Sequence, residues 1–191
     1  MENKSNALKD FVIPVVVLVA ICFAVTFLLA FTYGVTKPII DENTAAAASE
    51  ARKQVLSEAD NFKETDAELY VLEEGKVYAS EVYTADNGAG MVVTVKSNSY
   101  GGTLTSMVGI GKDGKITGVV VTEHADTPGV GTKAHDAGHL KQYEGLSALT
   151  SEDVKADTEV DAVTGASVSS GAVHKAVYCA LEQYKAMGGV S

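Results

Sequence analysis

The chain has 191 residues and a formal net charge of −10, which suits one compact domain with an appendage or at most two small domains. Charges in the first 36 residues cancel, so the whole negative charge lies on the 155 residues that follow. This acidity excludes a nucleic-acid-binding protein, because phosphate backbones need concentrated Lys and Arg. Two cysteines, Cys22 and Cys179, are too few and too far apart for a disulfide framework or an iron–sulfur cluster held by this chain alone.

Residues 11–36 form an uncharged, mostly apolar stretch. As a helix, the segment from Phe11 to Tyr33 would extend roughly 35 Å, enough to cross a hydrocarbon core of about 30 Å. A cleaved signal peptide is the alternative, but this stretch is longer than a signal h-region and no small-residue cleavage site follows closely. We therefore expect a retained transmembrane helix. Basic residues flank both ends, so the charges do not choose its orientation.

The next part of the chain predicts a helical stalk and then a sheet. Residues 43–59 are rich in Ala, Glu, Lys and Gln, which favours a helix within a stalk over residues 37–65. From residue 66 to residue 191 we expect an α+β domain. Its short β-branched runs, separated by turn signals such as Lys112-Asp113-Gly114, predict a mainly antiparallel sheet. The expected strands are 68–72, 76–84, 91–96, 104–110 and 116–123.

The last third of the domain changes character. After Thr127-Pro128-Gly129, Gly, His and charged residues predict an irregular or short-helical region up to Gly145. From Val173 to Met187, apolar residues recur at helical spacing, with charged residues on the other face. This pattern predicts an amphipathic C-terminal helix that packs on the sheet and ends at Gly188-Gly189.

A cluster of hydroxyl groups precedes this helix, in the run Asp161-Ala-Val-Thr-Gly-Ala-Ser-Val-Ser-Ser170. The hydroxyls could serve as helix N-caps, or the helix start could bind a phosphate through its free N–H groups. A third hypothesis makes Ser167 a nucleophile, because residues 165–169 nearly match the G-x-S-x-G elbow of α/β-hydrolases. The last glycine of that elbow and the strand before it are missing, which argues against a hydrolase.

The histidines suggest no metal site. His135 and His139 are four residues apart, as metal ligands on a helix can be, but the zincin motif needs Glu where Asp136 stands and Gly138 weakens a helix. We interpret both as ordinary surface histidines. The run from Glu123 to Gly131 contains Pro128, Gly129 and Gly131, which predicts a shaped loop after the last strand.

Three ordered motifs carry a resemblance to a known family. They are Ser99-Tyr-Gly-Gly102 with the hairpin at residues 112–116, then Asp126-Thr-Pro-Gly-Val-Gly131, and finally Asp161-Ala-Val-Thr-Gly-Ala-Ser167. Over residues 92–187 the chain resembles the covalent-flavin domain shared by the G subunit of Rnf complexes and the C subunit of the sodium-pumping NADH:quinone reductase. The N-terminal span and stalk also fit, and the shorter length favours the Rnf type.

The resemblance implies which residues hold the cofactor. In that family an S/T-G-A-T/S motif carries FMN as a phosphoester on its last hydroxyl. Here the motif is Thr164, Gly165, Ala166 and Ser167, so Ser167 would carry the flavin. By the same resemblance Asp126, Thr127 and Val130 would lie against the flavin ring. Asp126 and Val130 replace the more usual Glu and Leu, and Ser167 the more usual Thr.

The resemblance also implies a function. The chain would relay electrons singly through covalent FMN, as the redox subunit of a membrane complex that couples ferredoxin and NAD to movement of Na⁺ or H⁺. The other subunits and a Mg-dependent flavin transferase that uses FAD would be its partners. Residues 1–10 would lie in the cytoplasm and the flavin domain outside it. An anchored binding or assembly module of the same fold, without flavin, is the alternative from a different class.

Overall fold

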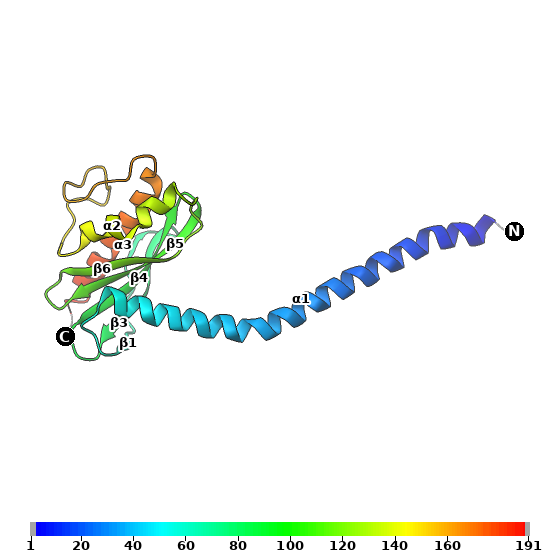
Figure 1. Cartoon of the computed structure of the whole chain (residues 1–191), viewed down its shortest axis with the longest axis horizontal. Coiled ribbons are helices and arrows are strands. Elements are labelled where there is room, and N and C mark those ends of the chain that lie inside the picture. The colour runs from blue at the N-terminus through cyan, green and yellow to red at the C-terminus, as the bar shows by residue number, and fades with distance from the viewer. Residues whose placement is uncertain (1–2, 190–191) are drawn as a thin grey trace. The chain divides into compact units, whose positions relative to one another are not determined.

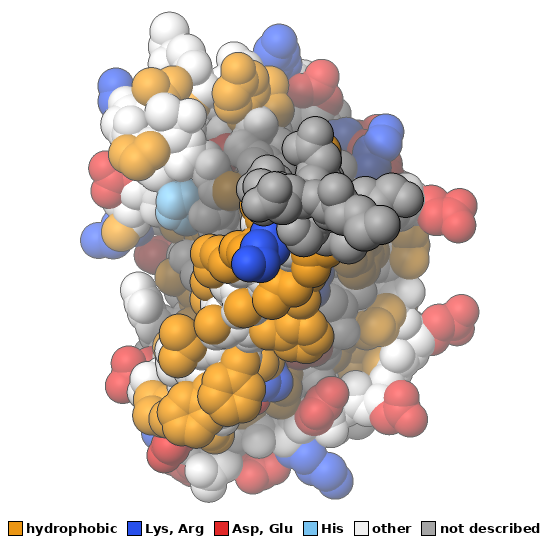
Figure 2. Space-filling model, turned by 90° about the vertical axis from the view of Figure 1, so that its right-hand side faces the viewer, with side chains coloured by type: hydrophobic (Ala, Val, Ile, Leu, Met, Phe, Trp, Pro, Cys, Tyr) orange, Lys and Arg blue, Asp and Glu red, His pale blue; other side chains and the backbone are white. Residues whose placement is uncertain are grey.

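The computed structural model describes residues 3–189 and divides into two compact units, Met1–Ala47 and Ala48–Ser191. The first unit belongs to α1 (Asn3–Val55), a continuous helix of 53 residues. Its apolar part has a mean hydropathy of 3.1 over its most apolar window, with none of that window buried, so it is long and apolar enough to cross a membrane. In the view of Figure 2, hydrophobic side chains gather in the middle, and most charged side chains lie toward the edge.

The helix ends earlier than the sequence predicts. Composition favoured helix as far as Ala59, but α1 stops at Val55. Leu56 and Ala59 are buried against the sheet, and the chain turns there into the short strand β1 (Phe62–Glu64), inside the segment expected as stalk. Helix propensity at these positions therefore yields to the burial of two apolar side chains.

All strand pairings in the described sheet are antiparallel, as predicted. The order is β1-β3-β4-β5-β6, and β2 pairs separately with β3. Besides β1, the strands are β2 (Val71–Glu73), β3 (Val77–Ala85), β4 (Gly90–Ser99), β5 (Gly102–Gly111) and β6 (Ile116–Glu123). Strand β1 was missed because three residues carry almost no alternation.

Each face of the sheet is covered by a helix (Figure 1). Odd-numbered residues of β4, such as Val93 and Val95, pack against Val173 and Val177 of α3 (Ser167–Ala186). Val92, an even-numbered residue of β4, belongs instead to a second hydrophobic cluster on the other face of the sheet, together with the last turns of α1. Because successive side chains of a strand point to opposite faces of the sheet, alternate residues of β4 belong to two different hydrophobic clusters. The α+β architecture with a packed amphipathic C-terminal helix is confirmed, but the helix begins at Ser167, inside the hydroxyl-rich run that was expected to precede it.

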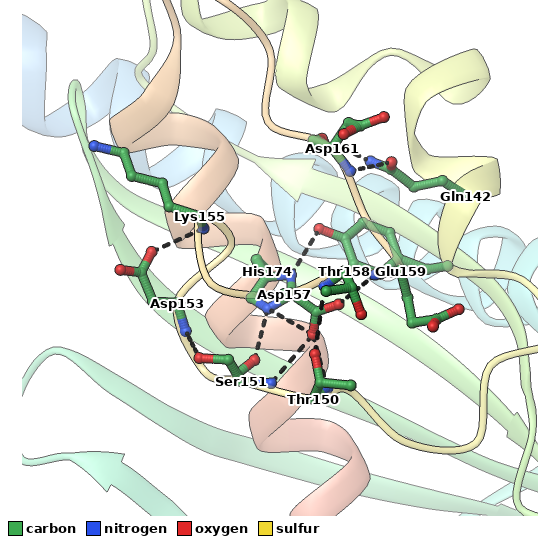
Figure 3. A network of polar contacts seen from close by, with 11 residues as sticks. Gln142, Thr150, Ser151, Asp153, Lys155, Asp157, Thr158, Glu159, Asp161 and His174 are labelled. Carbon is green, nitrogen blue, oxygen red and sulfur yellow. Dashed lines mark hydrogen bonds and ion pairs between the residues drawn. The ribbon is translucent and has the colours of Figure 1, made fainter.

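The chain between β6 and α3 folds onto α3. It forms the short helices η1 (Gly131–His135), α2 (Ala137–Leu140) and η2 (Lys141–Tyr143), followed by a long coil. The buried Asp157 carboxylate accepts N–H groups from Thr150, Ser151 and Glu159 (Figure 3). His174 of α3 places its Nε2 2.8 Å from the Ser151 carbonyl oxygen. These contacts attach the coil to α3.

A second set of hydrogen bonds holds the coil near its C-terminal end. The Gln142 side chain accepts the N–H of Asp161 at 2.9 Å and donates to its carbonyl oxygen at 3.2 Å, as a neighbouring strand would (Figure 3). These hydrogen bonds are made by Asp161, the first residue of the hydroxyl-rich run. The coil that leads into α3 is therefore held at both of its ends.

Candidate cofactor site

The start of α3 opens into a cavity of about 560 Å³, within the range of small-molecule and cofactor sites. Three segments far apart in the sequence surround it: the β4–β5 turn, the Pro-Gly loop and the first turn of α3. The lining residues are Tyr100, Thr127, Val130, Gly131, Gly165, Ala166, Ser167, Val168 and Ser169. Five of the seven predicted site residues, Thr127, Val130, Gly165, Ala166 and Ser167, are thus brought together.

A tight turn delivers Ser167 to this cavity. The Ala166 N–H donates to the Val163 carbonyl oxygen at 3.0 Å, and Gly165 has a φ of 84°, a conformation that L side chains rarely adopt. The buried Ser170 hydroxyl accepts the Val163 N–H at 3.0 Å, which ties the turn to the helix. Thr164 lies in the turn and is exposed, but it is outside the cavity lining.

The hydroxyl cluster does not cap α3. The N-cap residue is Ala166, and within the described chain it makes no side-chain capping hydrogen bond. The Ser170 hydroxyl accepts the Val163 N–H, and the Ser169 hydroxyl lies close enough to Asp126 to lower the pKa of that carboxyl. The capping hypothesis is therefore wrong. The positive end of the helix dipole faces the cavity without an acidic residue in the first turn, an arrangement that favours a bound phosphate.

Ser167 itself is exposed at the first residue of α3. It follows a coil rather than a strand, so the structure lacks the strand-turn-helix context of a hydrolase elbow in the described chain. Its hydroxyl lies at the edge of the cavity where a phosphate would meet the helix N-terminus.

Apolar side chains form another part of the cavity wall. Tyr100 is 76% exposed, Val168 56% and Val130 51%, although all three are large and apolar. Exposed apolar groups gathered around one cavity indicate a binding surface for a flat apolar ligand. Tyr100 belongs to the first sequence motif, but the sequence alone assigned it no role. Its one available signal was an aromatic residue at the tip of a two-residue hairpin.

The predicted contact residue Asp126 lies beneath the cavity rather than in its lining. Its side chain is fully buried. The Ser99 hydroxyl donates to Oδ2 at 2.5 Å, and the Gly101 N–H donates to Oδ1 at 2.7 Å. His135 places Nε2 3.0 Å from Oδ2. Burial raises the pKa of this carboxyl, but the hydrogen bonds and His135 outweigh burial and hold the pKa below its usual value.

The interpretation of both spaced histidines as ordinary surface residues is wrong for His135, whose side chain is only 7% exposed. His135 belongs to η1 and packs on Asp126 and His124, with 4.6 Å between the two imidazole centroids. His139 belongs to α2 and contacts the Gln142 amide. Among the described residues, no three His, Cys, Asp or Glu side chains gather as a metal-ligand set.

Acid is expected to destabilise the domain in two steps. Burial holds the pKa of His135 and His139 below the ordinary value of 6.5. The unfolded chain therefore binds more protons, and stability falls as pH drops through about 6.5, by at most about 1.4 kcal/mol per pH unit for each histidine. Asp126 and Asp157 have pKa values lowered from 3.8, so their contribution is lost only below that pH.

Urea denaturation of the micelle-bound protein at several pH values, followed by tyrosine fluorescence, measures this effect; the chain has 8 Tyr and no Trp. The double variant His135→Gln, His139→Gln should show a flatter profile just below about pH 6.5, where the histidines of the unfolded chain take up protons. An identical slope in the variant would contradict the assignment to these two histidines.

The comparisons with known proteins agree with this geometry. A family model described as FMN-binding domain matches residues 99–182, a range that includes every residue lining the cavity. Fold and site together define an FMN-binding domain that follows a helix able to span a membrane, and the protein is membrane-associated.

Curated relatives specify the family. The G subunit of an ion-translocating oxidoreductase complex from Methanosarcina acetivorans is 30% identical over 185 residues, covering 95% of this chain and 98% of its own length. The G subunit of the Na⁺-translocating ferredoxin:NAD⁺ oxidoreductase complex from Acetobacterium woodii is 31% identical, covering 82% and 83%. The crystal structure of NqrC from Shewanella oneidensis aligns with a TM-score of 0.44 at 23% identity, over 56% of this chain and 58% of that one. The chain belongs to the family of G subunits of ion-translocating oxidoreductase complexes.

Proposed function

We propose that this chain relays electrons one at a time through FMN held in the cavity at the start of α3, as the G subunit of an Rnf-type complex between ferredoxin and NAD. The observation that carries the proposal is an exposed Ser167 at an uncapped helix N-terminus that opens into a cavity inside the FMN-binding domain. The flavin supplies one-electron chemistry when bound. The chain's own contribution is to hold it in one place and to set the charge around it.

We further propose that the flavin is covalently attached to Ser167 through its phosphate. A flavin transferase would transfer FMN from FAD to the serine oxygen and release AMP. Three features support this site: the hydroxyl is exposed, the first-turn N–H groups point toward the position of the phosphate, and Gly165 and Ala166 leave room beside it. Thr164 and Gly165 form the turn that presents Ser167.

The flavin ring would lie on the apolar part of the cavity wall. Tyr100, Val130 and Val168 supply exposed apolar surface, and Thr127 supplies a polar group in the same lining. The Thr127 carbonyl oxygen accepts the N–H groups of both Val130 and Gly131, so the Pro-Gly loop has a fixed conformation in this wall. Asp126 would act from beneath the ring, without contacting it.

As part of a complex, the chain works with the other subunits and has no turnover of its own. Residues 11–36 contain no ionisable carboxyl, amine or imidazole group, so this span offers no side-chain path for Na⁺ or H⁺. We propose that the N-terminus lies in the cytoplasm and the flavin domain outside it, in line with the family resemblance. Protease added to intact cells should then digest the domain, whereas full protection would contradict this orientation.

The test of the function is attachment and redox cycling in the full-length protein. Coexpressed with a flavin transferase, the chain should gain the mass of one FMN minus one water and an absorption band near about 450 nm that dithionite bleaches and air restores. Expressed without the transferase, it should be colourless and unmodified. If the chain stays colourless with an active transferase, the better account is an anchored assembly module without flavin.

A further inference from the structure

A buried charged cluster lies directly beneath the cavity and belongs to none of the contacts proposed for the flavin. Its centre is Asp126, whose side chain is fully buried and whose two carboxylate oxygens are both occupied. Its partners come from three elements: the β4–β5 turn, η1 and the first turn of α3. Of these partners, Ser169 itself lines the cavity.

Each partner of Asp126 in the β4–β5 turn and in α3 is next to a residue that lines the cavity. Ser99 and Gly101 flank Tyr100, and Ser169 follows Val168 in α3. The fit is tight, because a Cβ added to Gly131 would lie 2.8 Å from the Ser169 hydroxyl and 2.9 Å from Cβ of Asp126. Asp126 therefore adjoins both the turn that carries Tyr100 and the first turn of α3.

His135 is the titratable partner in this cluster. Its side chain is only 7% exposed, Nε2 lies 3.0 Å from Oδ2 of Asp126, and both ring nitrogens are buried without a well-aligned hydrogen bond among residues 3–189. The exposed His124 ring packs on it, with 4.6 Å between the two ring centroids. The other charged groups near it, Lys141 and Glu144, line a separate surface cavity with His135.

We propose that His135 takes up a proton when the cofactor cavity gains an electron, and that Asp126 is the positioning residue that couples the two events. This inference rests on the proposed function. The electron comes from the redox partner in the complex and the proton comes from solvent. We assign the added proton to Nδ1, because Nε2 faces the carboxylate and would carry the proton of the neutral ring.

The charges explain why uptake follows reduction. Burial and the neighbouring His124 lower the pKa of His135, so it is neutral near pH 7, whereas Asp126 is ionised. The cluster thus holds one buried negative charge. A second negative charge in the cavity above raises the electrostatic cost, and protonation of His135 neutralises Asp126 at close range. A unit charge in a partly buried site changes proton affinity by at least about threefold.

The experiment is an NMR titration of the histidine ring protons in the full-length flavinylated protein, first oxidised and then reduced with dithionite. We expect the proton affinity of His135 to rise by at least about threefold on reduction. His139 is the matched control, because it is half-buried but packs on Gln142 instead of Asp126, and its affinity should not change. An unchanged His135, or an equal rise at both histidines, would overturn the proposal.

Variants at Asp126 and His135 distinguish a positioning role of Asp126 from a purely structural one. Asp126→Asn removes the charge, so His135 should bind protons more weakly and lose its response to reduction, while Asp126→Glu should restore part of it. In His139→Gln the flavin's reduction potential should still depend on pH. In His135→Gln this remaining pH dependence should be lost. If His135→Gln leaves that dependence intact, His135 is not the acceptor, even if Asp126→Asn fails to fold.

Failure of the proposed function is recognised separately. Intact mass and absorption are recorded first, and a chain that never carries flavin refutes the relay and, with it, redox-linked proton uptake. In the flavin-free Ser167→Ala protein, Asp126→Asn should still weaken proton binding at His135. If that coupling is present and reduction of flavinylated protein has no effect, only the further inference fails.

Discussion

A chain in which Ser167 is replaced by alanine is expected to carry no covalent flavin. The side chain is exposed at the first residue of α3, so its loss leaves the packing of the helix unchanged. The phosphoester, however, needs an oxygen at this position. Denaturing gels viewed under ultraviolet light should show a fluorescent wild-type band and a dark Ser167→Ala band, with a mass difference that includes one FMN.

Two controls make this result specific. Ser167→Thr keeps a hydroxyl at the same place and should retain the flavin. Thr164→Ala removes another exposed hydroxyl of the same motif, outside the cavity lining, and should also be labelled. A fluorescent band in Ser167→Ala would refute the attachment site, and loss of label in Thr164→Ala alone would move it to Thr164.

Gly109→Ala is expected to destabilise the domain more than any exposed substitution. Gly109 pairs with Gly118 in the sheet, and the end of α1 lies on this pair. A Cβ on Gly109 would lie 2.2 Å from the Val55 carbonyl oxygen, which also accepts the Thr117 hydroxyl at 2.5 Å. Because the added Cβ would meet the Val55 backbone and a Thr117 hydroxyl that is itself bonded to Val55, the cost should be about 2 to 4 kcal/mol, at the upper end of overpacking effects.

A graded series tests this explanation. At Gly118 the added Cβ would lie 3.0 Å from Cα of Val55, so Gly118→Ala should cost less than Gly109→Ala. Gly171 lies within α3 with open space around it, so Gly171→Ala should stabilise the protein by up to about 1 kcal/mol through helix propensity. Urea denaturation measures all three. Equal effects at positions 109 and 171 would show that α1 does not rest on these glycines.

Local patterns in the sequence were sufficient for most of the fold. Alternating apolar residues identified five strands within a few residues of their ends, and helical spacing after Val173 identified α3. Both signals arise from short-range periodicity, which one stretch of chain contains completely. The resemblance of the three motifs to flavin domains was likewise readable, and the family membership is confirmed.

Other features depended on partners far away in the chain. Helix α1 ends at Val55 because Leu56 and Ala59 are buried on the sheet, which propensity could not show. The serines near α3 looked like caps, yet Ser170 binds Val163 and the cap position is Ala166. Each of these outcomes is a competition between a local preference and a tertiary contact.

The sequence by itself determined an apolar span, an acidic antiparallel α+β domain, and the motif that ends at Ser167. Only the tertiary structure decided that Tyr100 joins Thr127 and Val130 in one cavity wall, and that Asp126 lies beneath this wall against His135. The physical reason is distance along the chain. A periodic pattern reports which face of one element is buried, whereas a cavity and a buried contact between a carboxylate and an imidazole exist only where several elements meet.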